Sequence, residues 1–568
     1  MRIERDLTRL SDPFDVVIIG AGITGVCVAR EAAGRGLRTL VIDKGDFGGG
    51  TSSATSKYIH GGIRYLESYQ FGVVRESLRE RRILALGAPH LVNQTRFLMP
   101  AWRWSKPRTP LIGAGVALYD MLSYDRNRDA PPSLRIPHPH WLSKQKLLAA
   151  VPWLDGDGLQ GAFAYHDTMN IHPERLLLAY LKTAAALGAV AINHAKATGF
   201  ITKPAADGTG MIVEGIEVDD QLTGETHRVM ARTVVNAGGP WMDIVLRDLG
   251  RPVGVKVQRS KGIHLLTRPL GGTDTVFARA RSGNHVIVSP WQGRSFIGPT
   301  DTAISEEPDD VRTDQADVAL VLDTINSMLN SSAKPLTEAD IESTSVGIRP
   351  LIVQEGTDSY HTSRRHELYS HAQTGVANLW SIGGGKWTTG RATGVEVVGA
   401  LLKSAVLKGH RTTEYDSARQ PAVGAFAWAT DAAPFLEQAA RSRAHLPLSL
   451  GFRNHLARLY GTECERIYDL IEHDASLADR ISDRDGCLDL AAQAVFAVTD
   501  EGARTLADVL DRRLVLGTLG RVTVEEIERL ARLIGPLLGW SEGSTVAAGE
   551  TEVARRAAIE ARWRTSRS

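Results

Sequence analysis

Four cationic side chains stand in or beside glycine- and proline-containing motifs of this 568-residue chain, where backbone turns could bring them together. They are Arg64, Arg349, Arg364 and Lys386. The chain has 66 Lys and Arg against 65 Asp and Glu, so no overall field attracts an anion. A local cluster of cations is what a phosphate-bearing small molecule requires, because guanidinium pairs with phosphate through parallel hydrogen bonds. Each cation alone is more often a solvated surface group, so the prediction depends on their joint placement.

The elements that must position these cations begin with a nucleotide-binding motif near the N-terminus. An apolar run leads into a glycine turn and a helix-like stretch, and a second apolar run ends at Asp43. In this layout Gly20 permits the tight turn, Gly22 lets a diphosphate approach the backbone, and Gly25 allows the helix to pack closely. Asp43 stands where an acid that holds a ribose hydroxyl is expected. A glycine turn without a ligand would not explain that acid, so the motif predicts a bound dinucleotide.

A second segment of small residues, Thr51–Glu67, follows shortly after Asp43. Glycines and small hydroxyl residues offer hydrogen bonds without bulk, which suits a large planar cofactor and its diphosphate. NAD must dissociate and needs no such wrapping, so the second cradle favours a flavin that stays bound, FAD. A flexible surface loop would explain the small residues, but not His60, Arg64 and Tyr65 directly behind them.

Two later turns extend the same predicted site. Asn236–Trp241 follows a strand-like run, and its small residues, including Gly238, let the backbone approach a ligand closely. Ser381–Thr389 is a strand, a glycine turn and a helix start, which can direct N–H groups at negative charge developing on a flavin ring. Gly384, Lys386 and Thr388 belong to this second turn.

Length and pattern predict several domains, because 568 residues are too many for one core. Alternating apolar residues predict paired strands over Gly210–Val218 and Arg228–Val235. His285–Val288 and Ser295–Gly298 predict a hairpin of an antiparallel sheet above a substrate cavity. After about residue 400 the pattern is helical, with a capping box at Thr523 and Glu526.

Composition excludes several classes of protein. Three cysteines without a C-x-x-C pair argue against a disulfide framework, a zinc site and an iron–sulfur cluster, so no metal is expected. They indicate a reducing, cytoplasmic compartment, and near-zero net charge gives no support for nucleic-acid binding. The charged N-terminus lacks a signal-peptide core, and no stretch predicts a membrane span. Trp102–Leu122 combines aromatics, cations and an apolar run, which fits either a membrane surface or an ordinary core helix.

The glycine motif, Thr51–Glu67, Asn236–Trp241, Gly347–Leu351 and Gly384–Thr389 resemble, in this order, the FAD-dependent glycerol-3-phosphate dehydrogenases of the aerobic, respiratory type. The resemblance implies an α/β protein: a glutathione-reductase-like FAD-binding Rossmann domain, an antiparallel β-sheet substrate domain and an all-α C-terminal domain. We expect the FAD-binding domain to cover 13–75, 160–245 and 340–400. The substrate-binding domain would cover 76–159 and 246–339, with a membrane-surface segment at 100–122, and the helical domain 401–568.

The resemblance also implies roles for individual residues. Arg64 and Tyr65 would face the substrate, Arg349 and Arg364 would bind its phosphate, and Lys386 would lie near both substrate and flavin. The expected contacts of FAD are Gly20, Gly22, Gly25, Asp43, Thr51, Ser52, Ser53, Lys57, His60, Gly238, Gly384, Lys386 and Thr388.

The implied reaction moves hydride from the secondary carbon of sn-glycerol 3-phosphate to flavin N5, giving dihydroxyacetone phosphate. Electrons would pass to a membrane quinone. The expected catalytic residues are Arg349, Lys386 and His60. Because arginine is a poor base, Lys386 or His60 is the better proton acceptor for the substrate hydroxyl. The chain departs from the family pattern at Gly390, where a tyrosine is expected, and at Asp43, where a glutamate is usual.

Other interpretations stay open. An oxidase on the same scaffold would pass electrons to O₂ and form peroxide, and the motifs do not separate it from a dehydrogenase. A non-catalytic flavin-bound scaffold or redox sensor would not need Arg349, Arg364 and Lys386 together. The family further suggests a homodimer, peripheral on the inner face of the cell membrane.

Overall fold

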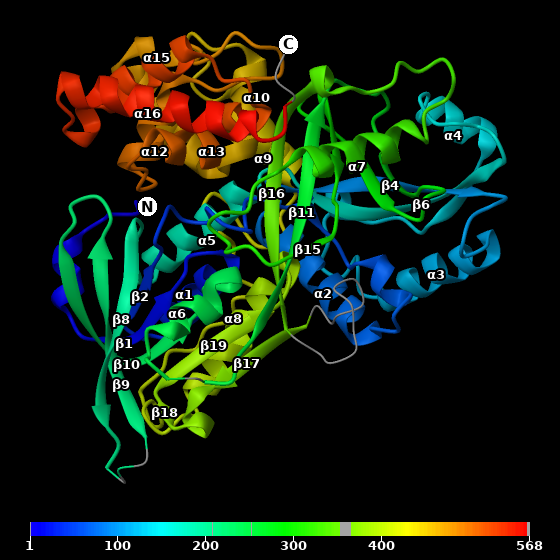
Figure 1. Cartoon of the computed structure of the whole chain (residues 1–568). Coiled ribbons are helices and arrows are strands. Elements are labelled where there is room, and N and C mark those ends of the chain that lie inside the picture. Colours follow the sequence, from blue (N-terminus) through cyan, green and yellow to red (C-terminus); the bar gives the residue numbers. More distant parts are fainter. Residues whose placement is uncertain (1, 207, 209, 252, 353–364, 565–568) are drawn as a thin grey trace.

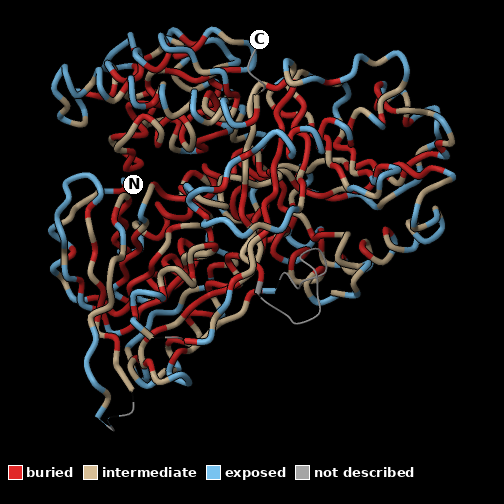
Figure 2. The backbone as a smooth tube through the Cα atoms, viewed as in Figure 1, coloured by how far each residue is buried: buried red, intermediate tan, exposed pale blue. Residues whose placement is uncertain are grey.

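Two β-sheets and a block of helices make up the part of the chain that the structure describes (Figure 1). This structure is a computed structural model, and it describes residues 2–206, 208, 210–251, 253–352 and 365–564. Buried backbone follows the strands of both sheets and the helices between them, whereas exposed residues gather on the outer turns (Figure 2).

The first sheet has the strand order β17-β19-β10-β1-β2-β7, and every pairing along it is parallel except that of β17 with β19. Its strands are β1 (Phe14–Ile19), β2 (Thr39–Ile42), β7 (Val190–Ile192), β10 (Thr226–Asn236), β17 (His366–Ser370) and β19 (Leu379–Gly384). All residues of β1 and β2 are buried, as expected for strands covered on both faces. Helix α1 (Ile23–Gly34) packs against α5 (Pro173–Ala186) and α8 (Gly390–Leu401). This is the predicted nucleotide-binding fold, and it brings the carboxyl ends of β1, β10 and β19 to one edge.

Two further strands extend the same sheet and form an antiparallel meander with β10. Strand β9 (Met211–Asp220) pairs with β8 (Ala195–Pro204) and with the first half of β10, while the second half of β10 pairs with β1. The strands predicted over Gly210–Val218 and Arg228–Val235 are therefore confirmed as a pair. A short parallel strand, β18 (Val376–Ala377), adds to the free edge of β9.

The second sheet has the order β15-β11-β14-β13-β12-β4-β6-β3, with β16 paired to β11 and β5 to β6. Its strands are β3 (Tyr58–Ile59), β4 (Val92–Trp102), β5 (His140–Ser143), β6 (Leu159–Asn170), β11 (Val257–Thr267), β12 (Thr275–Arg279), β13 (His285–Trp291), β14 (Arg294–Gly298), β15 (Thr302–Ile304) and β16 (Ile341–Ile352). Strands β13 and β14 form the predicted hairpin. Helix α7 (Gln315–Asn326) contacts β11.

Strand pairing differs from the predicted domain boundaries at three places. Strand β6 pairs with β3 and β4, and β16 pairs with β11 along its length, so β3, β6 and β16 all belong to the second sheet. All three fall within ranges that we expect to form the FAD-binding domain. The physical reason is that alternating apolar residues identify a strand but not its partner, which is set by contacts far away in the sequence.

The C-terminal region is helical, as predicted. It contains α9 (Ala432–Arg441), α10 (Leu450–Tyr460), α11 (Cys464–His473), α12 (Ala491–Thr499), α13 (Leu506–Arg512), α14 (Leu516–Leu519), α15 (Val524–Ile534) and α16 (Glu542–Ala561). Thr523 and Glu526 form the expected capping box at the start of α15. The core of this region includes Leu266, Trp291 and Phe296 of the second sheet, so the helices pack directly on that sheet.

The segment predicted to meet a membrane surface divides into two parts. Trp102 is only 3% exposed and stacks on Trp104 at 5.0 Å, so Trp102 is a core residue and not a surface anchor. Helix α3 (Thr109–Leu122), in contrast, buries only Val116 and Tyr119. None of the helices in the described ranges combines the length and the apolar character that a membrane crossing needs.

Candidate active site

One cavity of about 940 Å³ collects most of the predicted site residues. Its volume lies in the upper range of small-molecule sites. Both sheets contribute to its wall, since β1, β2, β10 and β19 end at it and β11 and β16 run along it. The predicted residues that line it are Gly20, Gly22, Asp43, Thr51, Ser52, His60, Arg64, Tyr65, Gly238, Arg349, Gly384, Lys386 and Thr388.

The glycine turn after β1 is shaped for a ligand that lies close to the backbone. Gly20 has φ +102°, and a Cβ there would lie 2.7 Å from the carbonyl oxygen of Ala237. A Cβ on Gly25 would lie 1.9 Å from the Gly20 oxygen, so α1 can follow the turn this closely only with glycine at 25. Ser52 Oγ accepts a hydrogen bond from the Ile23 N–H at 2.9 Å and fixes the second cradle against the helix start. This bare backbone fits the diphosphate of FAD.

Asp43 ends β2 at the cavity wall. Its carboxylate accepts hydrogen bonds from the N–H of Ala21 at 2.8 Å and of Gly45 at 3.0 Å, which hold it beside the glycine turn. Burial raises the pKa of Asp43, and the two backbone hydrogen bonds oppose this shift. A carboxylate held in this place fits a ribose hydroxyl, as the motif predicted.

At the other end of the cavity the cations converge on an aromatic ring. The Lys386 ammonium lies 4.5 Å from the centre of the Tyr65 ring, and the Arg64 guanidinium lies 5.7 Å from it. Lys386 also donates a hydrogen bond to the Ser77 hydroxyl on α2 (Phe71–Gly87). Arg364, the fourth predicted cation, lies outside the described residues.

Arg349 reaches the cavity from β16. Its guanidinium donates to the Thr300 carbonyl at 2.9 Å and pairs with Asp301 at 3.1 Å. A Cβ at Gly262, on the neighbouring strand β11, would lie 2.2 Å from a guanidinium nitrogen, so glycine there makes room for the side chain. The arginine is thereby held in one orientation across the sheet.

Two neutral histidines line the cavity between its cations. Burial lowers the pKa of His60 to about 4, an effect that Asp167 partly opposes. Burial lowers the pKa of His264 to about 3, and the charges of Arg349 and Lys57 add to the shift. His264 Nε2 forms a hydrogen bond with the Ser56 hydroxyl at 2.9 Å. No sequence motif marks His264, because a lone histidine inside an apolar strand is more often a core residue.

Three expected FAD contacts lie elsewhere. Gly25 packs beneath Gly20 instead of facing the cavity, which agrees with the packing role assigned to it. Ser53 and Lys57 line a separate cavity of about 490 Å³ on the other side of the same loop. The Lys57 ammonium lies 3.8 Å from the Glu174 carboxylate, and burial lowers the pKa of Lys57. Their positions therefore do not support contacts of Ser53 or Lys57 with the cofactor.

The glycine that replaces an expected tyrosine has a packing role. A Cβ at Gly390 would lie 3.1 Å from Ile23, and one at Gly394 would lie 2.7 Å from the carbonyl oxygen of Cys27. Helix α8 therefore approaches α1 through two glycines. A Cβ at 390 would require the Ile23 side chain to shift by a few tenths of an ångström.

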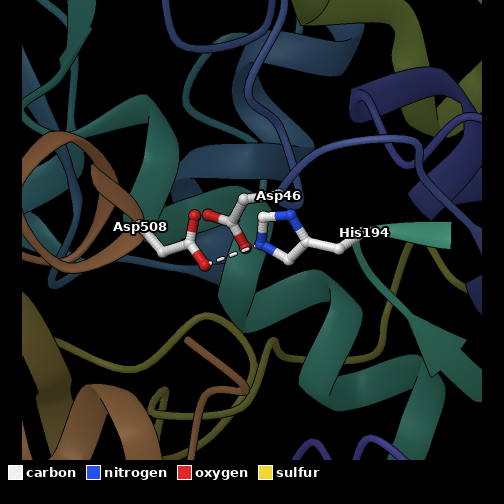
Figure 3. A group of neighbouring side chains, drawn as sticks. All are labelled: Asp46, His194 and Asp508. Atoms are coloured by element: carbon white, nitrogen blue, oxygen red, sulfur yellow. Dashed lines mark hydrogen bonds and ion pairs between the residues drawn. The ribbon is translucent and has the colours of Figure 1, made fainter. Parts of the chain in front are cut away.

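Asp46, His194 and Asp508 meet at the ribose end of the cavity and have the side-chain types of a metal site (Figure 3). His194 Nε2 lies 2.8 Å from Asp508 Oδ2. Arg512 and Arg513 both pair with Asp46, so guanidinium groups already supply positive charge at this carboxylate. Arg512 also lines the main cavity. The cluster joins the helical region to the loop that follows Asp43.

Comparisons with known proteins extend over the whole chain. The sequence profile of FAD-dependent oxidoreductases matches residues 15–400, and that of the C-terminal domain of alpha-glycerophosphate oxidase matches residues 417–545. A glycerol-3-phosphate dehydrogenase from Synechocystis sp. is 34% identical over 89% of each chain. Glycerol-3-phosphate dehydrogenase 2 from Mycobacterium tuberculosis is 31% identical over 94% of this chain and 86% of that protein.

Solved structures agree with these matches. The glycerol-3-phosphate dehydrogenase from Bacillus halodurans, complexed with FAD, superposes with a TM-score of 0.77 at 25% identity and covers 99% of this chain and 97% of its own. The L-alpha-glycerophosphate oxidase from Mycoplasma pneumoniae, at 16% identity and a TM-score of 0.53, shares the fold over 71% of this chain and 97% of its own. The chain therefore belongs to the FAD-dependent oxidoreductases and, within them, to the family of the glycerol-3-phosphate dehydrogenases.

Proposed function

We propose that this chain oxidises sn-glycerol 3-phosphate to dihydroxyacetone phosphate and passes the electrons to a membrane quinone. The observation that carries the proposal is the meeting of Arg64, Arg349 and Lys386 in the cavity that contains the glycine cradle. The names of relatives that match most of the chain support the substrate.

The cations suit the binding of a small organophosphate. Arg349 is held at the cavity wall by Asp301 and the Thr300 carbonyl, so its guanidinium can meet a phosphate without a large change of orientation. Lys386 and Arg64 extend the positive wall around Tyr65. Fixing the phosphate orients the secondary carbon of the substrate, which must approach the acceptor within about 3–3.5 Å.

FAD supplies the hydride acceptor when it is bound. The chain must then remove the proton of the secondary hydroxyl as its carbon loses hydride. His60 lines the cavity, and burial lowers its pKa to about 4, so its imidazole is neutral at neutral pH and can accept that proton, although as a weak base. The neighbouring Lys386 is a donor that can hold the developing oxyanion.

The electron acceptor distinguishes two candidate functions. A quinone dissolved in lipid requires a surface that meets the membrane, and α3 offers exposed Leu111 and Met121 behind exposed Arg103, Lys106 and Arg108. Oxygen requires no such surface, and the match of residues 417–545 to an oxidase domain favours that alternative. We infer that the protein is peripheral on the inner face of the cell membrane, with quinone as the acceptor. The homodimer suggested by the family remains a prediction.

An anaerobic titration tests substrate and acceptor together. Glycerol 3-phosphate should bleach the flavin absorbance of the holoenzyme, and a soluble quinone should restore it faster than air does. Faster recovery in air, with peroxide formed, would assign the oxidase function. A flavin spectrum that does not respond to glycerol 3-phosphate would refute the proposed substrate.

The variant Arg349→Ala tests whether Arg349 binds the phosphate of the substrate. The loss of charge-assisted hydrogen bonds, each worth about 1.5–3 kcal/mol, should raise KM by about 10- to 100-fold and weaken the preference over glycerol. Arg247→Ala is the control, because Arg247 is exposed and its ion pair with Glu307 lies on the surface. If Arg349→Ala still discriminates against glycerol as strongly as the parent, the phosphate binds elsewhere.

A further inference from the structure

Helix α3 is attached to the body of the protein at few points. Val116 and Tyr119 are its only buried residues, whereas Leu111 is 64% and Met121 is 65% exposed. Figure 1 shows α3 projecting at the side of the molecule near α2. Any contact between α3 and the wall of the cavity must therefore involve these two buried side chains.

The Tyr119 hydroxyl is bonded on both sides. It accepts a hydrogen bond from the Gly61 N–H at 2.8 Å and donates one to Asp167 Oδ2 at 2.6 Å. A Cβ at position 61 would lie 2.4 Å from this hydroxyl oxygen, so the approach depends on glycine. Burial and the Asp167 charge raise the pKa of Tyr119 well above its ordinary value, which keeps the hydroxyl protonated and able to donate.

The carboxylate behind Tyr119 is itself immobilised. Asp167 lies on β6, is 2% exposed, and accepts a hydrogen bond from Arg81 of α2 at 2.7 Å. Arg81 is 1% exposed and donates its other terminal nitrogen to Ser123, the residue that follows α3, at 2.9 Å. This closed set of bonds ties α3, α2 and β6 together around one hydroxyl.

Gly61 belongs to the loop that leads into a short 3-10 helix, η2 (Ile63–Leu66), and the two together present the proposed substrate groups. His60 precedes it and lines the cavity, while Arg64 and Tyr65 follow it and line the same cavity. Gly62 adopts φ +76°, so the loop turns sharply at this point. The N–H of Gly61 therefore holds the loop at the turn that places these three side chains.

We propose that Tyr119 is a positioning residue, which fixes the loop 60–65 through its hydroxyl and so determines how well the substrate binds. The proposal rests on the proposed function only in taking these loop residues as substrate contacts. Tyr119 itself touches neither the substrate nor the cofactor, and acts through Gly61 and Asp167. Because of these hydrogen bonds, the conformation of residues 60–65 depends on the position of α3.

Tyr119→Phe tests the proposal, because it keeps the ring and removes only the hydroxyl. In the resting holoenzyme, deuterium exchange of the peptide covering 58–67 should become at least tenfold faster, since the Gly61 N–H loses its acceptor. KM for glycerol 3-phosphate should rise by about tenfold with a smaller change in kcat, while the FAD content stays that of the parent. The exchange measurement needs no substrate, so it stands even if glycerol 3-phosphate does not reduce the flavin.

Thr109→Ala is the matched control, since it removes a different hydroxyl hydrogen bond of α3, the one to Gln160 on β6, and leaves Tyr119 in place. It should leave the exchange of the 58–67 peptide and KM unchanged. Unchanged exchange and KM in Tyr119→Phe, or equal changes in both variants, would overturn the proposal. If Tyr119→Phe does not fold, Asp167→Glu keeps the negative charge beside Arg81 but displaces the acceptor of the hydroxyl, and it should accelerate exchange of the same peptide.

Discussion

Two of the buried histidines, His90 and His264, make the stability of the chain sensitive to acid. They are 1% and 4% exposed, and burial lowers the pKa of each to about 3. Arg175 and Arg458 add to the shift at His90, as Arg349 and Lys57 do at His264. An unfolded histidine titrates near about 6.5, so the unfolded chain takes up protons first when the pH falls.

The stability that these neutral histidines provide is complete above about pH 6.5 and is lost progressively towards pH 3. At pH 5 each should cost about 2 kcal/mol of the free energy of unfolding relative to pH 7. Urea unfolding at the two pH values measures this difference. His90→Asn should reduce the stability lost between pH 7 and pH 5 by about 2 kcal/mol, and an unchanged loss would contradict this account.

Cavity residues could be predicted from the sequence where the local backbone conformation allows only one type of residue. Gly20 and Asp43 were identified because the turn and the ribose position each require one residue type. Lys57 shows the limit, because its neighbours line the cavity while its own side chain turns to Glu174. His264 could not be found at all, since its place in the cavity arises only when β11 pairs with β16.

The sequence predicts the individual strands and helices better than it predicts which strands pair with each other. The hairpin of β13 and β14 was evident from alternation and from the turn between the strands. Strands β3, β6 and β16 lie in ranges expected for the other domain, because no local pattern shows which sheet a buried strand joins. Helix α3 was ambiguous from its sequence, since an apolar run fits both a core helix and a surface helix.

Helix α3 gives a prediction at the scale of one element. Replacing its exposed Leu111 and Met121 with serine removes apolar surface that is available to lipid, so less protein should sediment with liposomes that contain anionic lipids. The flavin spectrum and the activity with a soluble acceptor should be unchanged. Leu450→Ser is the control, because Leu450 is 58% exposed but lies in the C-terminal helices. Equal sedimentation of parent and double variant would remove α3 as the contact.

At the scale of the whole molecule, the C-terminal helices contact the loop that follows Asp43, next to the predicted ribose site. Asp46 follows the ribose acid by three residues, and its carboxylate accepts hydrogen bonds from Asn193 at 3.0 Å and from Arg513 at 3.0 Å. Asn193 in turn donates to the Gly502 carbonyl at 2.9 Å. The sequence could not predict this clamp, since Asp46 and Arg513 carry no motif and stand far apart in the chain.

The clamp predicts that the helical region contributes to FAD retention. Asp46 and Arg513 have side chains with no exposed surface, so Arg513→Gln leaves a buried carboxylate with fewer compensating donors. Breaking a buried pair costs about 3–5 kcal/mol, although Arg512 remains to offset part of this. The variant should therefore unfold at lower temperature and release FAD, measured by flavin fluorescence, at lower denaturant than the parent.

Arg441→Gln provides the matched comparison for this clamp, because it removes an arginine from the same helical region without burying a charge. Arg441 pairs with Glu437 on the surface of α9, with side chains 72% and 62% exposed, and such pairs contribute about 0–1 kcal/mol. It should leave FAD release unchanged. If Arg513→Gln lowers the unfolding temperature but retains FAD up to the same denaturant concentration as the parent, the helices stabilise the fold without holding the cofactor loop.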